Sequence, residues 1–362
     1  MQQAALNCCN LRSATQARDG DATRHSLRSR QKFPFLTDSF RHFPFIFNHL
    51  HSTVTTRNYN LLPCVMPGPT DSSTWSLTEH LLSTFQGEHT TATQHPFLLA
   101  AAEGRLPKHI LSQWLANDRL YIHSYIRAAG KLLASIDLPP AAPETKQEPG
   151  DEAAETQLVD WLIEALVGVR REERFFIDVA DRYGLSINFE GQSAATETSQ
   201  QKPKPGLLPG LMMIQDIFGA IDRVADGLSI PLTVLAESST PVLLPWLEGA
   251  VTFWGTERCY LDAWSWARSK QAVVTTSGGS DDAGTEDADG GALRKEFIPN
   301  WSSVEFARFV GRLASLIDFA VAQALERAGD GADAVKDEIL KRVEQKWKTL
   351  LVAEASFWPD VE

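Results

Sequence analysis

The stretch HPFLLAAAEGRLPKHILSQWLANDRLY, residues 95–121, predicts a short helix, a turn and then a long amphipathic helix. In the second helix, apolar side chains recur at intervals of three and four residues and therefore share one face: Leu111, Trp114, Leu115, Tyr121, Ile122 and Tyr125. Asp118 lies in the middle of this face. Because we expect the face to be buried, the Asp118 carboxylate needs a partner or a polar cavity.

Helical patterns of this kind continue along the chain, and no segment alternates convincingly as a strand would. Pro107 suits a first helical turn, Gly184 a helix end, and Ser302 with Glu305 a capping box. We therefore predict an all-α, multi-helical bundle. The expected helices span residues 75–92, 96–103, 107–135, 156–183, 207–227, 240–268, 302–327 and 332–357.

Composition excludes several classes of protein. The 362-residue chain is 43% hydrophobic and carries a net charge of −12, without the basic, aromatic-interleaved clusters of nucleic-acid-binding proteins. No apolar run is long enough to span a bilayer, so we expect a soluble protein with no membrane partner. Three of the four cysteines lie near the start of the chain, and all nine histidines precede residue 124. This distribution disfavours both a disulfide framework and a Cys/His metal centre.

The first 65 residues differ from the rest, with eight Lys or Arg against three Asp or Glu. This composition fits either a mitochondrial transit peptide or a translated leader that precedes an alternative start at Met66. We expect residues 1–65 to be disordered, residues 66–362 to form a single helical domain, and the protein to be cytoplasmic, or mitochondrial if the transit peptide is genuine. Polar, Gly- and Pro-containing segments at 139–155, 190–206 and 271–291 predict mobile, disordered loops between helices.

Two further acids lie on apolar helix faces. Glu257 shares a face with Trp254, Leu261 and Trp264 in the pattern around residues 240–268, and Glu354 lies between Leu351 and Trp358 in the last one. Each acid, like Asp118, has two explanations. Arg119, Arg258 and Arg312 could supply ion-pair partners, or the acids could meet in one polar, aromatic-lined pocket suited to a small cationic or amino-bearing heterocycle.

Three motifs resemble the TenA (thiaminase II-like) family, whose members have the haem-oxygenase-like fold. The first joins His95-Pro96-Phe97, Gly104 to Pro107, Asp118 and Tyr121. The second is FIPNWSSVEF at 297–306, where Trp301 stands in place of the family's ring-contacting tyrosine, and the third joins Glu354, Phe357 and Trp358. The resemblance covers roughly residues 75–358.

The resemblance implies an enzyme of thiamine salvage or degradation that hydrolyses an aminopyrimidine without a cofactor or metal and that forms a homo-oligomer. It implies that Asp118 binds the amino group and a ring nitrogen, and that Glu354 and Glu257 exchange protons with the substrate. The other residues implied in binding are Tyr121, Tyr125, Trp301, Glu248 and Phe357.

The chain also departs from the family. Where bacterial members have a nucleophilic cysteine in an L-P-C segment, this chain has LLPWLEG at 243–249, which places it in a branch lacking the thiol. Glu257 or Glu248 is then the expected replacement, and Cys259 is expected to be a packing residue. The tyrosine expected near Pro209 is also absent, and Ile214 and Phe218 are found there.

Two other functions stay open. The missing thiol favours a non-catalytic aminopyrimidine-binding or interaction protein on the same fold. A haem or di-iron oxygenase would need an axial histidine, for which His80, His89 and His95 are candidates, or several Glu and His ligands. We expect His95 instead to begin a helix by bonding to the backbone.

Overall fold

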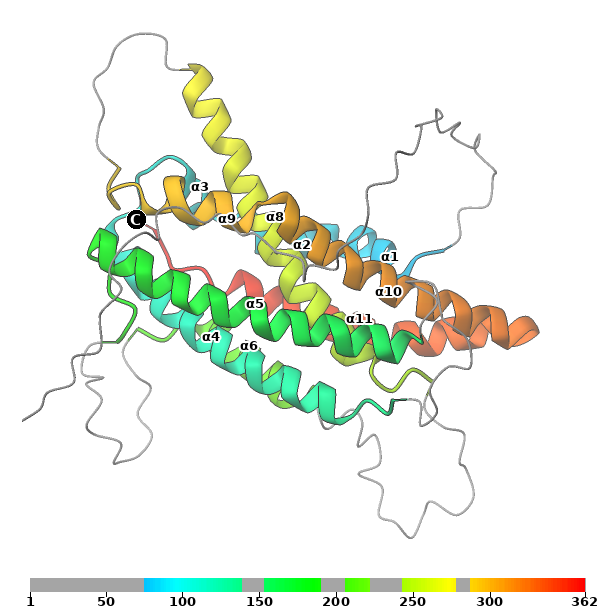
Figure 1. The fold of residues 1–362 in the computed structure, drawn as a ribbon. Helices are drawn as coiled ribbons and strands as arrows, with labels where there is room; N and C mark the ends of the chain where they lie inside the picture. Colours follow the sequence, from blue (N-terminus) through cyan, green and yellow to red (C-terminus); the bar gives the residue numbers. More distant parts are fainter. Residues whose placement is uncertain (1–74, 139–152, 190–205, 222–242, 278–286, 362) are drawn as a thin grey trace, which may run out of the picture. The chain divides into compact units, whose positions relative to one another are not determined.

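All regular secondary structure in the described part of this computed structural model is helical (Figure 1). The structure describes residues 75–138, 153–189, 206–221, 243–277 and 287–361, all of which belong to one unit, Phe47–Glu362. The all-α prediction is confirmed. The predicted leader at 1–65 lies outside the described residues, as does nearly all of the predicted loops at 139–155 and 190–206.

The helices follow the predicted order with local differences. They are α1 (Leu77–Thr84), α2 (Gln86–Thr93), α3 (Pro96–Ala102), α4 (Lys108–Ala134), α5 (Ala154–Tyr183), α6 (Pro209–Gly219), α8 (Leu247–Ser277), a π-helix (Leu293–Phe297), α9 (Ile298–Trp301), α10 (Val304–Ala328), a short 3₁₀ turn (Gly329–Gly331) and α11 (Ala332–Ala355).

Several helix ends follow the predicted signals and others shift by a residue. The His95 side chain accepts a hydrogen bond from the Phe97 N–H at the start of α3, and Gly184 adopts φ +63° after α5, both as expected. Pro107 is the N-cap of α4 rather than part of its first turn. The predicted capping box at Ser302 was wrong, because Ser303 makes the capping bond to Phe306.

The first predicted helix, at 75–92, is two helices. The backbone leaves helical geometry at Phe85, between α1 and α2. Just before this break the Ser83 hydroxyl donates to the carbonyl oxygens of Glu79 and His80, a local side-chain bond that competes with helix continuation. Amphipathic spacing alone did not reveal the interruption.

The prediction of a mobile loop at 271–291 was wrong at both ends of the segment. Helix α8 continues to Ser277, and residues 287–291 pack onto the bundle. Asp289 is buried and accepts hydrogen bonds from the Gly291 and Leu293 N–H groups. This anchoring begins the π-helix and α9, neither of which the sequence pattern predicted.

Helix α8 runs through the bundle and packs against α2, α3, α10 and α11, while α4 packs against α5 and α6 (Figure 1). Glycine permits one close approach: the Gly210 N–H donates to Ser356 O, and a Cβ at Gly210 would lie 2.4 Å from Ala353 O. Among the described residues, none of the helices combines the length and apolarity that a bilayer-spanning segment requires.

Aromatic rings fill the core beside α4 and α8. The ring centroids of Trp264 and Trp301 lie 4.6 Å apart, and those of Trp114 and Trp264 5.4 Å apart. Tyr260 joins the same cluster, with its ring centroid 5.3 Å from that of Trp301. Rings packed in this way hold one another in fixed orientations, so the Tyr260 hydroxyl has a defined direction.

Candidate functional site

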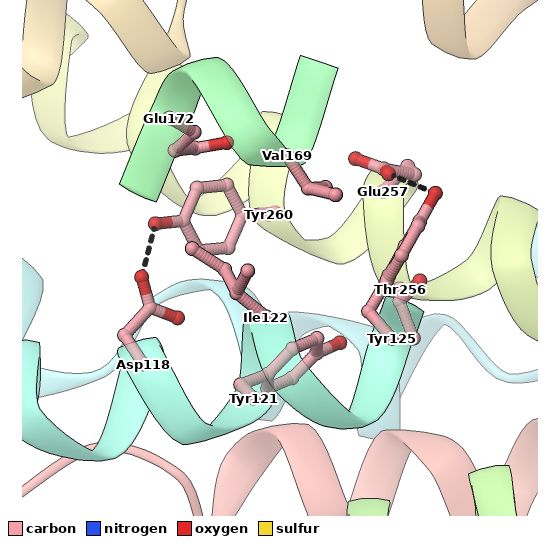
Figure 2. A pocket seen from close by; sticks show the side chains of 9 residues that line it. All are labelled: Asp118, Tyr121, Ile122, Tyr125, Val169, Glu172, Thr256, Glu257 and Tyr260. Atoms are coloured by element: carbon pink, nitrogen blue, oxygen red, sulfur yellow. Dashed lines mark hydrogen bonds between the residues drawn. The ribbon is translucent and has the colours of Figure 1, made fainter. Parts of the chain in front are cut away.

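A small cavity lies where α4, α5 and α8 meet (Figure 2). It encloses about 40 Å³. Helix α4 forms one side of the cavity, α5 the side opposite, and α8 the wall that joins them (Figure 2). The lining residues are Asp118, Tyr121, Ile122, Tyr125, Val169, Glu172, Thr256, Glu257 and Tyr260.

The apolar stripe of α4 delivers its polar members into this cavity. Asp118 is only 4% exposed, and its Oδ2 accepts a hydrogen bond of 3.2 Å from the Tyr260 hydroxyl. Two turns further along α4, the Tyr125 hydroxyl donates to Glu257 Oε1 at 2.7 Å. The structure therefore brings together four predicted site residues, namely Asp118, Tyr121, Tyr125 and Glu257, and pairs the two acids with tyrosines at opposite ends of the cavity (Figure 2).

Five of the nine lining residues were not predicted as site residues, and two of these five, Glu172 and Tyr260, have polar groups that make hydrogen bonds at the cavity. Glu172 projects from α5 toward the cavity, and its carboxylate accepts a hydrogen bond from the indole N–H of Trp301 (Figure 2). A signal for Glu172 was present, because it continues the buried stripe of α5 at spacings of three and four between Val169 and Phe176. The surrounding residues, RREER at 170–174, are all charged, a composition typical of a solvated helix face.

Trp301 was predicted to contact a bound ring directly. It is buried but is not among the residues lining the cavity. Its position is behind Glu172 and Tyr260, where it donates one hydrogen bond and packs in the aromatic cluster. Trp301 thus supports two lining residues.

Burial makes these carboxyl groups hard to ionise. Desolvation raises the pKa of Glu172 to about 7 and that of Glu257 to about 8. Desolvation also raises the pKa of Asp118 well above its ordinary value, and the neighbouring Glu172 charge adds to this effect. No Lys, Arg or His is found among the nine lining residues, so the lining itself offers no counter-charge.

Glu354 lies one side chain behind the cavity. It is 2% exposed, and its Oε1 accepts a 2.8 Å hydrogen bond from the hydroxyl of Tyr121, which lines the cavity. Desolvation raises the pKa of Glu354 to about 8. Phe357, also predicted to bind ligand, packs its ring 5.3 Å from that of Tyr121 and likewise does not line the cavity.

The three arginines considered as ion-pair partners bind other acids. Arg119 contacts Glu173, Arg258 contacts Asp262, and Arg312 contacts Glu164. Among the described residues, no ion pair involves Asp118, Glu257 or Glu354. The ion-pair explanation for these buried acids was therefore wrong for all three arginines.

Glu248 and the LLPWLEG segment lie away from the cavity. The Arg342 guanidinium binds both carboxylate oxygens of Glu248, at 2.8 and 2.6 Å, and the Trp246 indole N–H donates to Glu155. Glu248 is thus neutralised within the protein, which corrects its predicted binding role. The α8 residues that do face the cavity are Thr256, Glu257 and Tyr260, about three turns further on.

No thiol replaces the missing cysteine at this cavity. Cys259 is buried outside the lining, and desolvation raises its pKa well above the ordinary value, which disfavours the nucleophilic thiolate. On α6, Ile214 is buried, and the Phe218 ring packs 5.7 Å from Tyr121 and 5.9 Å from Tyr125. Apolar side chains thus occupy the region where a tyrosine was expected.

The histidines considered as axial haem ligands each lie beside another group of the protein, although the buried His89 Nε2 makes no hydrogen bond with the described residues. His80 Nε2 lies 2.8 Å from Glu344, His89 Nε2 lies 3.1 Å from Asp262, and His95 caps α3. In the described ranges, the His, Cys, Asp and Glu side chains do not form a group of three or more that could hold a metal ion.

Comparison with known proteins adds a family match. Residues 85–174 match the family model of the TENA/THI-4/PQQC family, and this segment carries six of the nine lining residues, from Asp118 to Glu172. A curated protein of Fusarium pseudograminearum, named "Probable transcription factor", is 24% identical over 318 residues, which cover 81% of this chain and 56% of that protein. The chain thus spans about half the length of this curated relative.

Solved structures of similar proteins include two described as TenA proteins. A TenA homologue from Pyrococcus furiosus is 19% identical, with a TM-score of 0.47 and coverage of 78% of this chain and 97% of that one. A TenA family transcription regulator from Silicibacter sp. TM1040 is 12% identical, with a TM-score of 0.49 and coverage of 78% and 94%. Residues 85–174 of this chain are thus similar to the TENA/THI-4/PQQC family.

Proposed function

We propose that the cavity between α4, α5 and α8 binds an aminopyrimidine of thiamine metabolism and hydrolyses it by carboxylate acid/base chemistry. One observation carries this proposal: three carboxyl groups from three helices, Asp118, Glu172 and Glu257, line one small cavity in which no basic side chain balances them. A ligand that presents N–H groups or a positive charge supplies what this lining lacks.

Asp118 is suited to hold the amino edge of such a ring. Tyr260 binds only Oδ2, and Oδ1 accepts no hydrogen bond from the described residues. An aminopyrimidine has an exocyclic N–H beside a ring nitrogen, which becomes a second donor when it is protonated. A carboxylate can pair with both, and such charge-assisted bonds are short and strong.

Ligand entry requires the cavity to widen. The enclosed space of about 40 Å³ is much smaller than the cavity of about 150 Å³ that holds a benzene ring in another protein. Glu172, Glu257 and Tyr260 are each only partly buried, so this side of the cavity is the one through which a ring enters. Small rotations of these side chains open the space between Asp118 and Glu257.

The two ends of the cavity then have different tasks. With Asp118 holding the ring, Glu257 lies at the other end, beside the methylene carbon that reacts. A water oxygen bonds to that carbon, the carbon–nitrogen bond to the leaving amine breaks with its electron pair on nitrogen, and Glu257 takes the proton that the water releases. Glu354 holds the Tyr121 hydroxyl and thereby one wall of the cavity.

Binding is tested by replacing Asp118 with asparagine. The substitution keeps an oxygen for Tyr260 but removes the charge, so we expect the affinity for 4-amino-5-hydroxymethyl-2-methylpyrimidine to fall about 10- to 100-fold. Isothermal titration of the full chain measures the change. Asp262→Asn is the matched control, because Asp262 lies on α8 outside the cavity and pairs with Arg258. Equal affinities for the wild type and D118N would contradict the proposal.

A non-catalytic binding protein is the second candidate function. It is favoured by the lack of a nucleophile: the lining has no cysteine, and its one aliphatic hydroxyl, on Thr256, donates to the Phe253 carbonyl oxygen. Binding of the pyrimidine without release of product from thiamin or from the aminomethyl pyrimidine would support this candidate and exclude the hydrolase.

A further inference from the structure

Two neighbouring glutamates on α5 have opposite surroundings. Glu173 contacts three cationic or protonatable groups, those of Arg119, His123 and Arg170. Desolvation raises the pKa of Glu173, but the hydrogen bond from His123 together with these charges outweighs it, and the net shift is downward. Glu172, the residue before it, lines the cavity. Within the described ranges, the Glu172 side chain accepts a single hydrogen bond, from the neutral indole of Trp301.

The groups that face Glu172 across the cavity increase the difference in electrostatic surroundings between Glu172 and Glu173. They are the carboxyl groups of Asp118 on α4 and Glu257 on α8, together with the hydroxyls of Tyr125 and Tyr260. A negative charge on Glu172 disfavours ionisation of all four groups and contributes to raising their pKa values. Glu173 has a structural role, because its contacts attach α5 to α4. A role of this kind does not explain why Glu172 is a carboxyl group that faces two other carboxyl groups.

We infer that Glu172 is a specificity-determining residue that makes the cavity prefer a ligand carrying a positive charge over its neutral isostere. This inference rests on the proposed function and names the chemical class of its ligand, an organic ammonium ion. The cation supplies the counter-charge that the lining lacks. Asp118, more than nine-tenths buried and with an Oδ1 that accepts no hydrogen bond from the described residues, faces the same space. The Trp301 indole fixes the Glu172 carboxylate in the orientation that meets the cation.

The test compares two ligands that differ in one charge. At neutral pH, 4-amino-5-aminomethyl-2-methylpyrimidine carries an ammonium group where the hydroxymethyl analogue has a hydroxyl. We expect the wild type to bind the ammonium ligand about 10- to 100-fold more tightly, as charge-assisted bonds allow. We expect Glu172→Gln to remove most of that preference and to change the affinity for the hydroxymethyl ligand less than about threefold.

Two further variants separate charge from structure. Glu172→Asp keeps the charge and should retain the ammonium preference, whereas Glu164→Gln removes a charge from α5 outside the cavity, where Glu164 pairs with Arg312, and should leave the preference unchanged. Circular dichroism and thermal unfolding establish that each variant is folded. If E172Q proves unfolded, Glu172→Ala is measured in its place, and an ammonium preference as large as that of the wild type in folded E172A overturns the inference.

The outcomes distinguish this inference from the proposed function. If both pyrimidines bind but the wild type does not discriminate between them, or E172Q discriminates as the wild type does, the role of Glu172 is overturned and the proposed function stands. If neither pyrimidine binds, the proposed function fails. The role of Glu172 is then tested by comparing the affinities for benzylamine and for its neutral isostere, benzyl alcohol. If the wild type binds benzylamine no more tightly than benzyl alcohol, the inferred role of Glu172 is overturned.

Discussion

Replacing Glu257 with glutamine is expected to reduce the rate of aminopyrimidine hydrolysis by about 10²- to 10⁴-fold while changing the affinity little. Glutamine preserves the size of the side chain and an oxygen for the Tyr125 hydroxyl, which donates to Glu257 at 2.7 Å. It removes the group that accepts the proton of the attacking water. The measurement is release of 4-amino-5-hydroxymethyl-2-methylpyrimidine from the aminomethyl pyrimidine and from thiamin, under single-turnover conditions.

The pH dependence gives this prediction a second readout. Because the pKa of Glu257 is about 8 and a base acts in its ionised form, kcat/KM of the wild type should rise with pH and level off above about 8. The residual activity of E257Q should lack this rise. Glu164→Gln serves again as the control and should retain wild-type rates. An E257Q rate within threefold of the wild type would exclude Glu257 as the catalytic base.

The second large effect concerns stability. Glu354 has a folded-state pKa of about 8, which lies well above the ordinary value of 4.5. The folded protein therefore holds this proton more tightly than the unfolded chain, and folding stability falls as the pH rises from about 4.5 to about 8. Glu354→Gln is neutral at every pH, so we expect it to be about 2–4 kcal/mol more stable than the wild type at pH 8 and nearly equal to it at pH 4.

Urea unfolding of the full chain between pH 4 and pH 9 measures this difference. Glu338→Gln on the same helix is the matched control, because Glu338 is exposed, and it should follow the wild-type curve throughout. Two results would show that Glu354 is ionised and favourably bound in the folded protein. One is that E354Q is less stable than the wild type at pH 8, and the other is that the stability of E354Q declines with pH as steeply as that of the wild type. The account of an electrostatically costly carboxyl cluster would then be wrong.

Helical periodicity predicted most of the fold and part of the site. The spacing of apolar residues placed Asp118, Glu257 and Glu354 on buried faces, and all three have pKa values raised by burial. Their convergence could not be predicted, because it depends on how α4, α8 and α11 cross. In the structure Asp118 and Glu257 share one cavity, whereas Glu354 reaches it only through Tyr121.

The residues that sequence reasoning placed wrongly share a physical cause. Glu248 matched a short motif, but its role depends on Arg342, which lies 94 residues away in the chain and neutralises it. Glu172 stands among charged sequence neighbours, although its own spacing marks it as inward-facing. Local patterns show which face a side chain occupies, but tertiary packing decides which partner it meets.

The central claim is that one cavity between α4, α5 and α8 is where an amino-bearing ring binds. The most direct measurement is a crystal structure of the full chain with 4-amino-5-aminomethyl-2-methylpyrimidine. We predict the ring between Asp118 and Glu257, with its amino edge within hydrogen-bonding distance of Asp118 Oδ1 and its ammonium group beside Glu172. A ring bound elsewhere on the protein, with this cavity still closed around Tyr121 and Tyr260, would contradict the account.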